Sequence, residues 1–433
     1  MHNFFTLYGY ELKKIFKRKI VFITLGVLTA VVIYLNIAGP LGTTHSWPDD
    51  EGNIIRMNGF EWIADQKAKT KELNGQIIDD AQIIDDALLN KVKDAYKNVY
   101  RNEYNVQTDD GSGYGYRQTI IGMLDDGEES AEERKAADRK REIYKPIYDY
   151  IQRVTGVYDN VHNIDADSLY QTRQEHLLER EWAHLMMTDK EKEYWMEREK
   201  DIERPFTYDY AGSWNTMLDD FIYINMILVL AITICLSNIF SDEHLKLTDQ
   251  QILCSKHGKG RFFFAKIAAG ITFGIICSVL MFLVFVMSNI CVYGPEGSRV
   301  VIQLYRPLCS LSLTMGQTVF LMGGICIIVG IVYSIVAMFL SEAVNNAIAV
   351  MAIMTGGMLL TMLIQIPYQH RVVSQIYSLL PTRILNAEQL WDGRLVSLFG
   401  MHLTNYQAAI ILYVVVGVLL IWKGNHIWQK VKN

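Results

Sequence analysis

The chain is 433 residues long, half of them hydrophobic, and carries a formal net charge of −6. Residues 41–220 hold 39 acidic and 23 basic side chains, whereas the remainder of the chain holds 8 acidic and 18 basic ones. The uneven charge excludes one uniform soluble domain and indicates an acidic, soluble-looking insert inside a basic, apolar protein.

Six apolar runs are long enough, or nearly so, to cross a hydrocarbon core that is about 30 Å thick and needs about 20 helical residues. No Lys, Arg, Asp or Glu lies well inside any of them. Helices buried in a large soluble core are usually shorter, so we expect an all-α, six-span helical membrane protein. The runs are 20–38, 220–240, 262–291, 313–340, 345–366 and 407–424.

Residues 1–19 place apolar side chains on one face of a helix, with Lys and Arg elsewhere. This pattern predicts an amphipathic helix that lies on the cytoplasmic membrane surface before the first span. The run 20–38 follows bases, as the apolar part of a signal peptide does. It is longer than such a region, however, and lacks a small-residue cleavage site, so we expect an uncleaved anchor.

Residues 39–219 form the acidic insert, which we expect to be a mostly helical extracytoplasmic domain. Apolar residues recur at helical spacing in "IIDDAQIIDDALLNKVKDAYKNVY", and "EESAEERKAADRKREIYK" runs from acids to bases as a helix dipole favours. The insert has no cysteine, so it folds without disulfides. Of the six cysteines elsewhere, Cys291 and Cys309 bracket one short loop, and the sequence leaves open whether they pair or stay free.

Basic residues near the span ends indicate the orientation, because cytoplasmic loops are enriched in Lys and Arg. Six spans place three regions on one side, with 13 bases: the N-terminus, residues 241–266 and the C-terminal end from Lys423 onward, which includes the tail 425–433. The short loops on the other side carry only five: Arg299, Arg306, Arg371, Arg383 and Arg394. We therefore expect both termini in the cytoplasm, and the segment 367–406, with its short helices, outside.

The loop 241–261 contains the signature of a short helix. Thr248 and Gln251 fit a capping box, and Gly258 fits a stop after the last turn. These signals predict a two-turn helix over 249–256 that presents an apolar patch including Ile252 and Leu253. Two turns are not stable alone in water, so a partner protein or the cytoplasmic ends of the chain must hold them.

Motifs for chemistry are absent from the sequence. It lacks a phosphate-binding G-x-x-x-x-G-K-[ST] loop, an H-E-x-x-H zinc motif, a G-x-S-x-G elbow and paired cysteines at zinc spacing. We therefore expect no enzyme activity, no bound cofactor and no metal in this chain. The uncharged spans also argue against an ion-coupled transporter, which needs ionisable side chains inside the membrane to bind and release the ion.

The order of these features resembles the permease subunits of ABC-2 type transporters. In that family the loop between the second and third spans carries an acidic residue, a short coupling helix and then a basic residue that opens the third span. Here "FSDEHLKLTDQQILCSKHGKGRFFFAKI" follows the same order, from Glu243 through the 249–256 helix to Lys266. The likeness covers about 240 residues of the membrane part; the large insert departs from the small external loops of many members.

The resemblance implies a permease energised by separate ATPase subunits that bind the ATP. It also implies a second permease subunit, identical or not, and contact with the lipids of a bacterial plasma membrane. No nucleic-acid partner is implied. The implied cargo is a hydrophobic peptide or a lipid-like molecule that is exported or extracted. The alternatives are a receptor or scaffold whose external helical domain binds a ligand, and a secondary transporter. The residues expected to contact the ATPase are Glu243, Gln251, Ile252, Leu253 and Lys256.

Overall fold

The fold is mostly helical, with four two-stranded antiparallel sheets among the described residues. This agrees with the all-α expectation. The coordinates are a computed structural model. The structure describes residues 2–48, 54–74, 82–96, 99–106, 116–123, 131–155, 164–245, 260–398 and 401–430.

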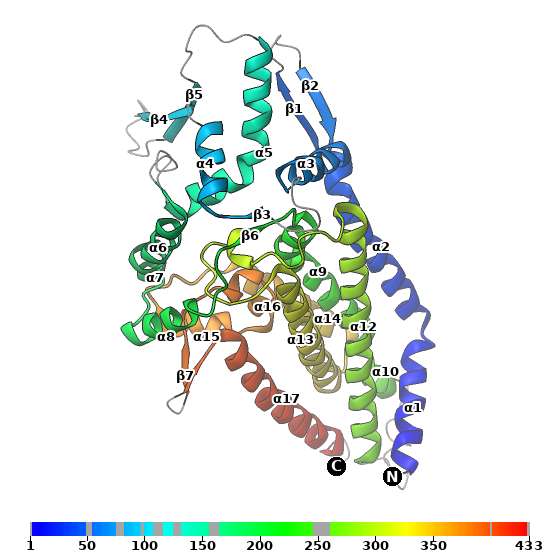
Figure 1. The fold of residues 1–433 in the computed structure, drawn as a ribbon. Coiled ribbons are helices and arrows are strands. Elements are labelled where there is room, and N and C mark those ends of the chain that lie inside the picture. The colour runs from blue at the N-terminus through cyan, green and yellow to red at the C-terminus, as the bar shows by residue number, and fades with distance from the viewer. Residues whose placement is uncertain are drawn as a thin grey trace.

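Five helices in the described ranges are long and apolar enough to cross a membrane. Both termini lie at one end of the helical bundle, and the acidic insert extends from the other end (Figure 1). The second of the five continues through a turn into the short helix α10 (Ser241–Leu245). The five helices are α2 (Lys19–Gly42), α9 (Gly212–Leu236), α12 (Arg261–Tyr293), α13 (Met315–Val344) and α17 (Asn405–Lys430).

The expected span 345–366 gives a shorter helix, α14 (Ala347–Leu363), of 17 residues. Asn345 adopts a left-handed conformation with φ of 56°, which ends α13, and the side chain of Asn346 then caps the first turn of α14. At 1.5 Å per residue the helix is about 25 Å long, slightly short of a typical hydrocarbon core. The structure therefore has five long apolar helices and one shorter one.

The helices α9, α12 and α13 form the centre of the bundle, and small residues let two of them approach closely. A Cβ at Gly274 of α12 would lie 2.0 Å from the hydroxyl of Ser334 on α13. A Cβ at Gly330 would meet the hydroxyl of Ser278 at the same distance. The glycines at these two positions therefore set the spacing of the central pair.

Large apolar side chains cover the outer surface of the bundle. Those on α2, α14 and α17 are exposed along most of each helix, and Leu363 at the end of α14 is 79% exposed. A soluble protein rarely exposes a continuous apolar surface of this size. Together with the five long helices, this surface indicates a membrane protein.

The insert is built mainly from helices joined to short hairpins. The hairpin β1–β2 leads from α2 into α3, and a separate two-stranded sheet pairs β3 with β6, which is far away in the chain. The helices are α3 (Gly59–Asn74), α4 (Asp86–Ala95), α5 (Ala131–Thr155), α6 (Ala166–His176), the π-helix η2 (Leu177–Glu181), α7 (Trp182–His184) and α8 (Asp189–Glu199). The strands are β1 (Thr44–Pro48), β2 (Ile54–Asn58), β3 (Gln82–Ile83), β4 (Val99–Val106), β5 (Tyr116–Met123) and β6 (Thr207–Tyr208).

Short elements connect the long helices, and the insert contacts one of these connections. Arg173 of α6 is buried, forms an ion pair with Glu199, and donates 2.8 Å hydrogen bonds to the carbonyls of Pro307 and Cys309 in the loop between α12 and α13. The insert is thus fixed to the bundle by buried polar contacts. The short elements are η3 (Ile302–Leu304), α15 (Arg371–Ser378), α16 (Pro381–Ile384), η4 (Ala387–Leu390), β7 (Val396–Leu398) and β8 (Met401–Leu403).

Candidate functional site

The N-terminal helix α1 (His2–Phe16) packs lengthwise against α12 (Figure 1). The hydroxyl of Tyr8 donates to Thr272 Oγ1 at 3.0 Å, and the rings of Phe16 and Phe273 contact edge to face. Ile15 is buried. The apolar face expected to rest on the membrane surface therefore packs partly on α12.

Glu243 lies at the centre of a buried charge cluster between α1, α10 and α12. Lys14 Nζ of α1 donates to Glu243 Oε1 at 2.7 Å, and Lys266 of α12 forms an ion pair with the other carboxylate oxygen. Glu11 lies 4.0 Å from Lys266 Nζ, and the ammonium also lies over the rings of Phe240 and Phe262. We call Glu11, Lys14, Glu243 and Lys266 the loop-base cluster.

Lys266 is 1% exposed, so its charge depends on the acids around it. A buried ammonium is costly unless it is paired, because the protein interior replaces little of the water that it loses. Glu243 and Glu11 supply that pairing from two different helices. The members of the loop-base cluster therefore depend on one another, because removing either acid leaves the buried ammonium of Lys266 with less opposite charge nearby.

A second set of polar contacts lies beside the loop-base cluster. Arg18, which follows α1, donates to Asn238 Oδ1 and reaches Asp242 Oδ2 at 3.4 Å. On the other side, the hydroxyl of Ser241 donates to the carbonyl of Ser341 on α13 at 3.1 Å. The start of the loop is thus joined to α1, α12 and α13.

Four of the five residues expected to contact an ATPase lie outside the described residues, as does the expected helix 249–256. These four are Gln251, Ile252, Leu253 and Lys256. Glu243 is described, and it is 4% exposed. The described chain resumes at Gly260, one residue before α12, the helix that carries Lys266 of the loop-base cluster.

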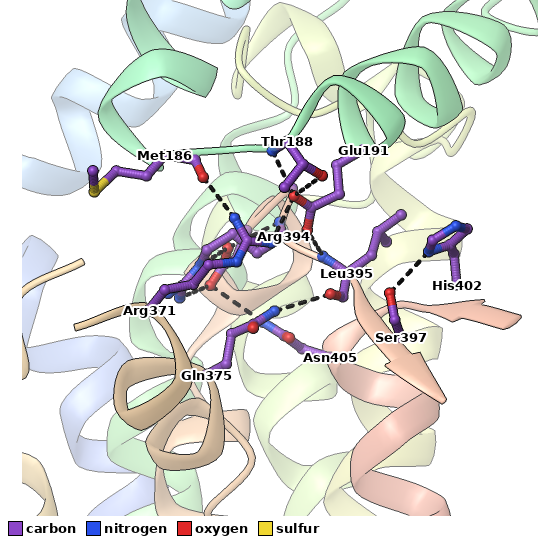
Figure 2. Close-up of polar contacts among 12 residues, drawn as sticks. Met186, Thr188, Glu191, Arg371, Gln375, Arg394, Leu395, Ser397, His402 and Asn405 are labelled. Carbon is purple, nitrogen blue, oxygen red and sulfur yellow. Dashed lines mark hydrogen bonds and ion pairs between the residues drawn. The ribbon is translucent and has the colours of Figure 1, made fainter. Parts of the chain in front are cut away.

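A second polar network joins the insert to the segment between α14 and α17 (Figure 2). Its centre is Glu191 of α8, which is 3% exposed. Arg371 Nη2 lies 2.6 Å from each of the two carboxylate oxygens, and the Leu395 N–H donates to the carboxylate at 2.7 Å. The N–H and hydroxyl of Thr188 also donate, at 2.7 and 2.8 Å. Glu191 thus holds α8 to α15 and to the chain that leads into α17.

Burial opposes ionisation of Glu191, but the hydrogen bonds from Arg371, from the Leu395 N–H and from Thr188 outweigh it. The pKa of Glu191 therefore lies below its ordinary value. A carboxylate held charged in this way stabilises the contact between insert and bundle at neutral pH.

Arg394 forms the second half of the network in Figure 2. Its Nε donates to Asp392 Oδ1 at 2.8 Å, and its Nη1 donates to the hydroxyl of Ser374 on α15 at 2.7 Å. Asn405, the first residue of α17, donates to Asp392 at 3.2 Å. Burial disfavours the charge on Arg394, but Asp392 outweighs it and raises the pKa of the guanidinium. The start of α17 is therefore tied to α15.

Little in the amino-acid sequence points to this network. In the sequence, Arg371 and Arg394 are distinguished only as basic residues of short loops, and Glu191 is one of many acids in the insert. Glu191 and Arg371 are 180 residues apart, so no local spacing connects them. The one local signal is Asp392-x-Arg394, an acid and a base two residues apart in an otherwise uncharged stretch.

Comparison of the chain with family models, with curated proteins and with solved structures gives no match in any of the three. In the described ranges, no group of three or more His, Cys, Asp or Glu side chains is placed to hold a metal. Cys291 and Cys309 are both free, Cys291 exposed and Cys309 buried.

Proposed function

We propose that the chain is the permease subunit of an ATP-driven ABC-2 type transporter, energised by separate ATPase subunits. It exports or extracts a hydrophobic peptide or lipid-like molecule and pairs with a second permease subunit. The protein spans the bacterial plasma membrane six times, with α14 as the fifth span, and both termini are cytoplasmic. No reaction is catalysed by this chain.

The observation that supports this proposal is the loop-base cluster. A loop that an ATPase pushes must transmit the force to the membrane-spanning helices. A loop whose ends made no contact with those helices would transmit little of it. Here Glu243 at the start of the loop and Lys266 shortly after its end are paired with each other and with α1. A push on the loop would therefore move α1, α9 and α12 together.

In this proposal the five residues have two roles. Gln251, Ile252, Leu253 and Lys256 contact the ATPase, and the buried Glu243 positions the loop. The polar network around Glu191 is the corresponding link on the far side, because it ties the insert to α15 and α17. Movement of the spans would then reach the insert, which gates the pathway or selects the substrate.

The test is co-purification of an ATPase with the tagged full-length chain from its native cells. We expect the wild-type chain to retain a protein that contains a phosphate-binding loop. The double variant Ile252→Asp with Leu253→Asp should lose it, because two charges would replace the apolar patch. The matched control places two Asp in the tail, at Val431 and Lys432, and should retain the ATPase.

Retention of the ATPase by the Ile252/Leu253 double variant would refute the assignment of this helix as the contact. Absence of any ATPase from the wild-type preparation, together with specific capture of a ligand by the insert, would instead favour the receptor or scaffold.

A further inference from the structure

A polar cavity of about 500 Å³ lies between the end of α14 and the helices α15, α16 and η4. It is on the side of α15 opposite a second cavity that borders Glu191 and Arg371. Its walls carry two guanidinium groups, Arg383 and Arg394, and one carboxylate, Glu388. Aromatic rings contact both cations: Arg394 lies 4.6 Å from the centre of the Tyr368 ring, and Arg383 lies 5.6 Å from that of Tyr377.

The two arginines differ in their partners. Arg394 is neutralised by Asp392 and also donates to Ser374, so its charge is used within the protein. Arg383 forms no ion pair with any described residue, and its Nε is buried without a hydrogen-bond acceptor in the same ranges. A buried guanidinium N–H without an acceptor is costly, and guanidinium groups bind carboxylates and phosphates best. Among the described residues, Arg383 is therefore the cation in this cavity that has no anionic partner.

Glu388 is the complementary group. It is exposed, and it accepts a hydrogen bond from Asn386 Nδ2 at 3.2 Å but forms no ion pair within the described part of the chain. Arg383 and Glu388 both line the cavity without being joined to each other. A cavity with a separate cation and anion is complementary to a ligand that carries both charges.

The cavity adjoins the apolar surface of α14. Residues 365–368 line it directly after the last turn of that helix. Leu363 and Ile364, just before them, are 79% and 49% exposed. A ligand with a charged head and an apolar tail could therefore place its head in the cavity while its tail follows α14.

We propose that this cavity binds the zwitterionic phosphoester headgroup of a membrane phospholipid. The phosphate contacts Arg383, the ammonium contacts Glu388, and the acyl chains lie along α14. This site does not depend on the proposed transport function, because a membrane protein of any function could hold such a lipid.

The experiment measures the binding of a tail-labelled phosphatidylethanolamine to the purified full-length chain in detergent by fluorescence anisotropy. Loss of a hydrogen-bonded charge pair predicts at least about tenfold weaker binding for Arg383→Gln. Arg383→Lys keeps the charge without the planar fork and should bind with intermediate strength. Arg299→Gln removes an exposed external arginine outside the cavity and should bind like the wild type.

Glu388→Gln supplies a second, independent test, because the side chain is exposed and its loss should not affect folding. The wild type should prefer phosphatidylethanolamine to the anionic phosphatidylglycerol, and Glu388→Gln should lose that preference. Equal binding by the wild type and both variants of Arg383 would overturn the site. Competition by deacylated glycerophosphoethanolamine at the same concentration as the intact lipid would overturn the lipid as its source and indicate a soluble phosphoester.

Discussion

Replacing Glu243 with Leu should strongly destabilise the protein, because it leaves Lys266 buried. The ammonium of Lys266 is 1% exposed, and its remaining described acid, Glu11, lies 4.0 Å away. Removing one partner of a buried ion pair costs about 3–5 kcal/mol, since the other charge stays in the protein interior without compensation. We expect a loss of this size for Glu243→Leu.

Two controls separate this effect from a general loss of packing. The double variant Glu243→Leu with Lys266→Met should recover most of the lost stability, because apolar residues of similar volume often replace a buried pair at little cost. The variant Lys14→Met removes the partly exposed cation, whose side chain is 38% exposed, and should cost no more than about 1 kcal/mol.

The assay is unfolding of the purified chain in detergent by a denaturant series, with the midpoint and slope measured for each variant. The order of stability should be wild type, Lys14→Met, the double variant, and then Glu243→Leu. A cost for Glu243→Leu no larger than that for Lys14→Met, or no recovery on adding Lys266→Met, would refute the role of Glu243 as the partner of a buried cation.

Three further outcomes follow from the same structure. Because the pKa of Glu191 is lowered by folding, its stabilisation is present at neutral pH and is lost as pH falls below about 4; hydrogen exchange of α8 should speed up there, and Glu191→Gln should remove that pH dependence. Gly274→Val should cost about 1–3 kcal/mol in detergent unfolding because its Cβ would meet α13, whereas Gly26→Ala, with nothing within 4 Å, should be neutral or slightly stabilising. Arg173→Met should loosen the insert, because the buried Glu199 loses its ion-pair partner. Limited proteolysis should then cut the insert faster while the helical bundle stays intact, and unchanged proteolysis would contradict this.

The long apolar helices could be predicted from the sequence, because crossing a membrane imposes one strong requirement, a long run of apolar residues. That requirement concerns consecutive residues, so the runs 20–38 and 407–424 can be recognised without knowing which other helices they contact. The run 345–366 shows its limit: hydropathy alone did not reveal that the left-handed Asn345 and the cap at Asn346 delay the helix, or that it ends at Leu363.

The charged sites could not be predicted in the same way, because they join distant parts of the chain. The sequence marked Glu243 and Lys266 by their positions around the loop, but not their burial or their contact with α1. Contacts such as Glu191 with Arg371 depend on how the insert folds back onto the bundle. Such pairs form only after packing brings the elements together, so their residue types alone carry no signal.

The central claim is that the loop between α10 and α12 faces the cell interior, where a separate ATPase could hold it. Thiol labelling of intact cells with a membrane-impermeant reagent tests it, with single-cysteine variants that retain either Cys254 or Cys291. Cys291 is exposed at the opposite end of α12 and serves as the external reference. We predict labelling of Cys291 in intact cells and of Cys254 only after permeabilisation; ready labelling of Cys254 in intact cells would contradict the account.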